Sequence, residues 1–180
     1  MINRKIARRY AKALMKIGQQ DGNYERYWEE LNSFTSLFQK EEGLRAVLIN
    51  PVFDVPRRQS IIREIGNRLG LSPITMNFLR LVADKNRMRY LSDITSVYQE
   101  LVDEAAGRAR IFLITAHELP DDKLQELARG LEGLVGKKVL MEVATDPSLI
   151  GGVVAKVGGM VYDGTVKTHL QRLKETLAKG

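Results

Sequence analysis

The chain contains no cysteine among its 180 residues. This absence excludes disulfides, thiolate metal sites and cysteine nucleophiles, and it fits a reducing compartment. Histidine is almost as scarce, because His117 and His169 are the only two and they lack the HxxxH or HExxH spacing of helical metal sites. We therefore expect no metal site and no bound cofactor.

Long apolar runs are also missing. No segment approaches the roughly 20 apolar residues that cross a bilayer, so we expect no membrane span. Residues 1–18 are basic and free of acids, which fits either a transit peptide or the first helix of the fold. We favour the helix, because the pattern continues directly into further helical sequence. The net charge of +6 is mixed with acids nearly everywhere else, and it permits an acidic partner without requiring nucleic acid.

Apolar residues in the first 105 positions recur three and four apart, and nothing there alternates with period two. In the first segment the stripe is Ile6, Tyr10, Ala13, Leu14 and Ile17. Asn50-Pro51 and Gly70 mark boundaries, and Ser72-Pro73 is a helix start. This half is predicted to be a six-helix bundle, residues 1–105, with helices at 4–18, 24–39, 42–49, 56–69, 73–84 and 91–105.

After Gly107 the pattern changes. Residues 108–116 are β-branched and aromatic, residues 138–144 alternate, and an amphipathic helix follows Pro120 between them. A final helix carries Val166, Leu170, Leu173 and Leu177. Residues 106–180 are therefore predicted to form a small C-terminal α/β domain with a short mixed sheet and two helices. The whole chain is then an α+β protein of two domains.

The stretch DPSLIGGVVAKVGGMVYDGTV, residues 146–166, has the glycine content of a phosphate loop. A P-loop requires GxxxxGK[ST], and the chain contains neither GK[ST] nor GxGxxG. The valines instead alternate as in a hairpin, which favours a turn at Gly158-Gly159 and a second turn at Asp163-Gly164. Gly151-Gly152 is expected to mark a bulge or a close backbone approach.

We find no catalytic constellation. Asp121 and Asp122 are adjacent, so they do not face each other on a helix, and the helix dipole explains acids in a first turn. An alternative function is nucleic-acid binding, because residues 61–81 have the outline of a helix-turn-helix. A recognition helix needs a polar face, however, and the second of these helices is apolar on two sides.

Spare apolar faces indicate a different kind of site. The helix at 73–84 carries one stripe of Ile74, Phe78, Leu81 and Val82 and a second of Met76, Leu79 and Ala83. The helix at 4–18 has small residues, Ala7, Ala11 and Gly18, beside its main stripe. Small residues permit close approach of another helix, so these faces suggest a groove for an amphipathic partner helix. Ordinary bundle core is the alternative explanation.

The chain resembles the δ subunit family of bacterial F-type ATP synthases, which includes the mitochondrial oligomycin-sensitivity-conferring protein. The resemblance rests on ARRYAKAL at 7–14, Ile49-Asn50-Pro51, LVADKNR at 81–87 and, most specifically, DPSLIGGVVAKVGGMVYDGTVKTHLQRL at 146–173. It implies a non-catalytic stator subunit, present in one copy, that couples rotor torque to ATP synthesis and hydrogen ion transport. It implies neither nucleic-acid nor cofactor binding. No presequence precedes ARRYAKAL, which favours the bacterial form at the cytoplasmic face of the inner membrane.

The resemblance also implies partners. The bundle receives, between its first and fifth helices, the N-terminal helix of an α subunit, and the C-terminal domain meets the C-terminal ends of the b subunits. We expect the groove to be lined by Ala7, Tyr10, Ala11, Leu14, Met76, Leu79, Arg80 and Ala83. The structural signature is expected to comprise Gly151, Gly152, Gly158, Gly159, Asp163 and Gly164.

Overall fold

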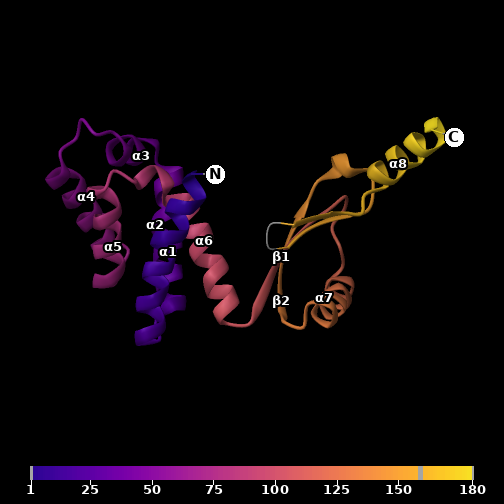
Figure 1. Ribbon diagram of the computed structural model, residues 1–180, viewed down its shortest axis with the longest axis horizontal. Helices are drawn as coiled ribbons and strands as arrows, with labels where there is room; N and C mark the ends of the chain where they lie inside the picture. The colour runs from indigo at the N-terminus through magenta and orange to yellow at the C-terminus, as the bar shows by residue number, and fades with distance from the viewer. Residues whose placement is uncertain (1, 158–159, 180) are drawn as a thin grey trace. The chain divides into compact units, whose positions relative to one another are not determined.

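The computed structural model describes residues 2–157 and 160–179 and separates into two compact units (Figure 1). The first unit runs through Val102 and the second starts at Asp103, close to the boundary expected after residue 105. In the described residues, eight α-helices accompany one four-stranded sheet. Six of these α-helices precede the first strand in the chain, as the change of sequence pattern at Gly107 predicts.

The helices before the sheet begin and end within a few residues of the predicted segments. Capping explains two of the sharpest starts, because the side chains of Asp54 and Ser72 accept hydrogen bonds from the backbone N–H groups of Arg57 and Thr75. The helices are α1 (Ile2–Asp21), α2 (Tyr24–Lys40), α3 (Glu42–Ile49), α4 (Val55–Arg68), α5 (Pro73–Asp84) and α6 (Leu91–Ala105), with a 3₁₀ turn at Met88–Tyr90.

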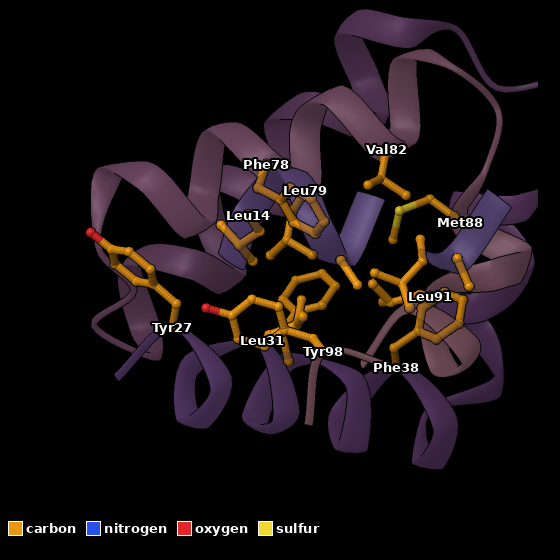
Figure 2. Packing of buried hydrophobic residues seen from close by; sticks show 14 of the residues in the cluster. Leu14, Tyr27, Leu31, Phe38, Phe78, Leu79, Val82, Met88, Leu91 and Tyr98 are labelled. Atoms are coloured by element: carbon orange, nitrogen blue, oxygen red, sulfur yellow. The ribbon is translucent and has the colours of Figure 1, made fainter. Parts of the chain in front are cut away.

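One hydrophobic core joins these helices. Figure 2 shows Leu14, Leu31, Leu79 and Tyr98 directed into the same interior from α1, α2, α5 and α6, and each is at most 1% exposed. The Tyr98 hydroxyl reaches the edge of the core and donates a hydrogen bond to the Tyr24 carbonyl at 3.0 Å. The hydroxyl of this buried residue therefore has a hydrogen-bond partner, as burial of a polar group requires.

The small-residue face of α1 lies inside this unit. Ala7 and Ala11 are 0% exposed, and Gly18 is also buried. A Cβ added at Gly18 would lie 2.7 Å from the Cα of Tyr24, so only glycine permits α1 to approach the start of α2 this closely. Leu14 and Met15 of α1 are buried as well, whereas Ala13 and Ile17 point outward and are exposed.

The second unit is a mixed sheet in the order β2-β1-β3-β4. Strand β1 pairs parallel with β2 and antiparallel with β3, which pairs antiparallel with β4. Its small core contains Ile111, Leu113 and Val139, with Leu131 of α7 packed against them. The elements are β1 (Arg108–Thr115), α7 (Asp121–Val135), β2 (Lys138–Thr145), a 3₁₀ turn (Pro147–Leu149), β3 (Val153–Val157), β4 (Met160–Asp163) and α8 (Val166–Lys179).

The glycine-rich stretch is the predicted hairpin. Gly152 has φ +90°, and a Cβ there would lie 2.4 Å from the Gly164 carbonyl oxygen. Close backbone approach, and not a bulge, therefore explains this glycine. Asp163 accepts a hydrogen bond from the Thr165 backbone N–H at 2.9 Å at the start of α8. The expected turn residues Gly158 and Gly159 lie outside the described residues.

Gly18→Ala should destabilise the first unit by about 1–3 kcal/mol, because the added methyl group overlaps the backbone of Tyr24. Urea unfolding followed by the fluorescence of Trp28, the only tryptophan, reports on this unit. Gly43→Ala is the matched control, since a Cβ at this position in α3 meets nothing within 4 Å. The control should be neutral or stabilising by up to about 1 kcal/mol. Equal stability of both variants would contradict the packing described for α1.

Candidate functional site in a groove between α1 and α5

A groove with a volume of about 630 Å³ runs between α1 and α5. Its floor includes Leu14 and Phe78, which are almost fully buried, and its walls include Ile17 and Leu81, which are 42% and 47% exposed. The complete lining is Arg9, Tyr10, Ala13, Leu14, Ile17, Ile74, Asn77, Phe78, Leu81, Lys85 and Arg87. An apolar depression of this kind, with polar groups confined to a few positions, is typical of a binding site.

An aromatic and cationic cluster closes one part of the groove. The rings of Tyr10 and Phe78 meet edge to face, with centroids 6.3 Å apart. The Arg87 guanidinium lies 5.3 Å from the centroid of the Tyr10 ring, and it donates a hydrogen bond to the Tyr10 hydroxyl at 3.1 Å. These contacts join α1 to the segment after α5, and they fix Tyr10 in place before any partner binds.

The start of α5 is fixed by a carboxylate from α2. Glu30 accepts hydrogen bonds from the backbone N–H and the hydroxyl of Ser72, at 3.0 and 2.6 Å, and from the Arg26 side chain at 2.8 Å. Burial alone would raise the pKa of the Glu30 carboxyl, but the hydrogen bonds from Ser72, Thr75 and Arg26 outweigh it and lower the pKa below its ordinary value. Glu30 therefore anchors the wall of the groove in its ionised form.

The end of α5 is fixed from α4. Arg58 is 3% exposed, and its guanidinium donates to the Ala83 carbonyl at 3.3 Å and to Asn86 Oδ1 at 2.7 Å. Asn86 has φ +54°, a left-handed conformation that asparagine tolerates better than most residues. A cation at a helix C-terminus also interacts favourably with the helix dipole. Both ends of α5 are thus held, so the groove wall is preformed.

The residues expected to line the partner site lie in three places in the structure. Of the predicted residues, the groove contains Tyr10 and Leu14. Ala7, Ala11, Leu79 and Ala83 are instead buried in the core, at 0–1% exposure. Met76 and Arg80 face α4, where the Met76 Cε would lie 3.2 Å from a Cβ at Gly66, and Arg80 donates to Gln59 at 3.4 Å.

The groove lining and the expected set thus differ mainly in which face of each helix they include. Small side chains lie where helices of the bundle approach most closely, so they belong to the interior. The groove is lined by Tyr10, Ala13, Leu14 and Ile17 on α1 and Ile74, Phe78 and Leu81 on α5, together with the polar residues Arg9, Asn77, Lys85 and Arg87. The sequence contained a signal for this face. Arg9 belongs to the basic edge of α1, and on a helical wheel it is the member of that edge nearest to Ala13.

The geometry disfavours a helix-turn-helix. The exposed residues of α5 are Pro73, Asn77, Leu81 and Asp84, which include no cation, so this helix does not present the basic polar face of a recognition helix. Within residues 2–157 and 160–179, the structure contains no cluster of three potential metal ligands. No helix in the same residues is long and apolar enough to cross a membrane.

Comparison with known proteins identifies the family. The family model for the ATP synthase delta (OSCP) subunit matches residues 6–177. The chain belongs to this family. The ATP synthase subunit delta of Desulfatibacillum aliphaticivorans is 44% identical over 179 residues, covering 99% of this chain and 98% of that protein. Its counterpart from Desulfosudis oleivorans is 43% identical over 180 residues, covering 100% of this chain and 98% of that protein.

A solved structure shows the same fold. One chain in the cryo-EM structure of the Toxoplasma gondii mitochondrial ATP synthase hexamer superposes with a TM-score of 0.76, over 96% of this chain and 97% of that one, at 21% identity. The δ-family chain is thus a stator component of the peripheral stalk of an F-type ATP synthase, and it is not catalytic. The nucleic-acid-binding alternative is not supported.

Glu30→Gln should lower the stability of the first unit at neutral pH by about 1–2 kcal/mol, because a charged acceptor of several hydrogen bonds is lost. The folded-state pKa of Glu30 is depressed, so its contribution is present above the ordinary glutamate pKa of about 4.3 and disappears as pH falls through the folded-state value. Urea unfolding of both proteins between neutral pH and about pH 3 should therefore show the difference shrinking as pH falls.

Glu29→Gln is the matched control for this experiment, because Glu29 is the exposed neighbour of Glu30 on α2. It should change stability by less than about 0.5 kcal/mol at every pH. A Glu30→Gln effect that stayed constant down to the lowest pH would show that the ionised carboxylate does not anchor α5.

Proposed function

We propose that the groove between α1 and α5 binds the N-terminal helix of an α subunit, and that the second unit binds the C-terminal ends of the b subunits. Helices α1 to α6 then act as a six-helix bundle that grips the catalytic head. One copy per complex, at the cytoplasmic face of a bacterial inner membrane, links that head to the peripheral stalk. This link holds the head against rotor torque, which couples ATP synthesis to hydrogen ion transport.

The preformed apolar groove is the observation that carries the proposal. Helix α5 has 12 residues and is therefore about 18 Å long, which corresponds to roughly three turns of a partner helix. The apolar residues of both walls recur three and four apart, as in Tyr10, Ala13 and Ile17. A bound helix with the same spacing would interleave its own apolar face with these rows.

A static mechanical link needs a slow dissociation rate more than it needs adaptability. The buried floor at Leu14 and Phe78 supplies apolar contact at the centre, and exposed Ile17 and Leu81 become covered when a helix docks. Anchors of this kind, surrounded by groups that exclude water, dominate the binding energy of protein interfaces. The fixed ends of α5 reduce the ordering that binding requires, which favours affinity.

The second unit has a separate apolar surface that supports the proposed contact with the b subunits. Ile150, Val166 and Leu170 are 71%, 44% and 58% exposed around the start of α8. Ile150 also has φ +61°, an unfavourable conformation for a β-branched residue. A strained residue that also exposes a large apolar side chain costs stability in two ways, which favours a role in binding.

Ala13→Trp should abolish binding of a synthetic peptide with the N-terminal sequence of the cognate α subunit, raising Kd at least about 100-fold, or roughly 2.7 kcal/mol. Ala13 is exposed and lines the groove, so the indole fills the site while the bundle stays folded. Calorimetric titration of the full chain measures Kd, and circular dichroism checks the helix content.

Ala46→Trp is the matched control, because Ala46 is an exposed alanine on α3 outside the groove lining. Its Kd should stay within about twofold of the unmodified chain. Equal affinities for the unmodified chain and the Ala13→Trp variant would place the peptide elsewhere. Ala11 is unsuitable for this test, since it is fully buried and a tryptophan there would disrupt the core.

Ile150→Gly should stabilise the second unit by about 1 kcal/mol and weaken its binding to a peptide from the C-terminal end of the cognate b protein at least tenfold. Glycine relieves the positive φ, and it removes the exposed side chain. Thermal unfolding followed by far-ultraviolet circular dichroism and a peptide titration give the two values. Retained affinity in a stabilised variant would remove Ile150 from the proposed contact.

A further inference from the structure

The cations of the first unit are unevenly partnered. Away from the groove, some exposed arginines pair with acids on their own helices, as in Arg26–Glu30, Arg45–Glu42 and Arg68–Glu64. Helix α1 contains no acid before Asp21. Among the described residues, no carboxylate pairs with Lys5, Arg9, Lys12, Lys16, Lys85 or Arg87. Arg8, Lys40 and Arg63, also without a carboxylate partner among the described residues, lie outside the groove lining, so what distinguishes the groove is that its cations stand in a row along one wall.

The cations on α1 form one straight edge. At 100° per residue, Lys5, Arg9, Lys12 and Lys16 lie within a sector of about 60° of the helix. Arg9 itself lines the groove, and Ala13, on the groove wall, is about 40° further around the helix. The row therefore borders the groove along α1, on the side opposite the bundle core.

The opposite wall has a different character. Along α5 the lining is Ile74, Asn77, Phe78 and Leu81, all uncharged, and positive charge returns only beyond its end at Lys85 and Arg87. The one acid at the end of α5, Asp84, accepts a hydrogen bond from Gln59 of α4, on the side away from the groove. The electrostatic potential is accordingly more positive along the α1 wall of the groove than along the α5 wall.

We infer that the helix bound in this groove carries carboxylates along the edge of its apolar face that lies over α1, and that these meet the row Lys5, Arg9, Lys12 and Lys16. This inference rests on the proposed function of the groove and adds the chemistry and the rotational setting of the partner. The opposite edge of the bound helix, which lies over α5, is expected to be uncharged. Exposed, unscreened charge acts mainly on the rate of encounter, so the row steers the partner helix into place and fixes its rotation.

The test uses the full chain, stopped-flow mixing and the same synthetic peptide from the N-terminus of the cognate α protein. The double variant Lys12→Glu/Lys16→Glu brings the net charge of the row to zero by changing two positions outside the groove lining. The control Lys40→Glu/Arg63→Glu makes the same change in net charge at exposed positions on α2 and α4. At about 50 mM NaCl the first variant should associate about tenfold more slowly and the control within about twofold of the unmodified chain.

Salt and peptide chemistry supply the second arm. At about 500 mM NaCl the chain, the variant and the control should associate at similar rates, because the Debye length falls well below the width of the groove. A peptide with its Asp and Glu residues replaced by Asn and Gln should associate with the unmodified chain about as slowly at low salt as the original peptide does with the variant.

Three results would overturn the inference while leaving the groove as the binding site: association that is independent of salt, equal slowing by the row variant and its control, or an amide peptide that associates as fast as the original. Failure of the unmodified chain to bind the peptide at any salt concentration would instead overturn the proposed function, and this inference with it.

Discussion

The groove exists because α1 packs on the bundle through its smallest residues. Ala7, Ala11 and Gly18 bring the backbone of α1 so close to its neighbours that a methyl group at position 18 would overlap Tyr24. This contact fixes the rotation of α1 about its axis. Once the small side chains face inward, Ala13 and Ile17 have to face outward, beside the exposed stripe of α5. The binding surface is therefore a geometric consequence of the core packing.

The same principle of close backbone approach operates in both units. In the first, Gly18 sets the distance between α1 and α2. In the second, Gly152 sets the distance between the start of β3 and the turn before α8, where its missing side chain leaves room for the Gly164 carbonyl. Gly152 of the glycine-rich motif thus shapes the backbone through this close approach. The surface they position, around Ile150 and α8, is where this unit exposes apolar side chains.

Local pattern predicted the helices and strands, but it could not decide which faces of α1 and α5 line the groove. The helix start at Ser72 follows from capping chemistry, and the strands follow from alternation, so their bounds depend on neighbouring residues alone. Which apolar stripe of α1 or α5 faces the core depends on how closely the other helices approach. Both stripes are apolar in sequence, so periodicity cannot separate them. The anchoring of α5 by Glu30 and Arg58 likewise joins residues far apart in the chain, and nothing local indicates it.

The fixed ends of α5 bear on how a stator component stays bound while torque is applied. A load on a docked helix passes to both walls of its groove, and a wall that could shift would let the helix loosen. Glu30 and Arg58 hold α5 by hydrogen bonds to the backbone or to capping groups at its two ends, so the load is shared with α2 and α4. Exposed Ile17 and Leu81 cost the free protein some solvation energy, and that cost is recovered only in the complex. Under the proposed function, permanent occupation of the groove would keep both side chains covered.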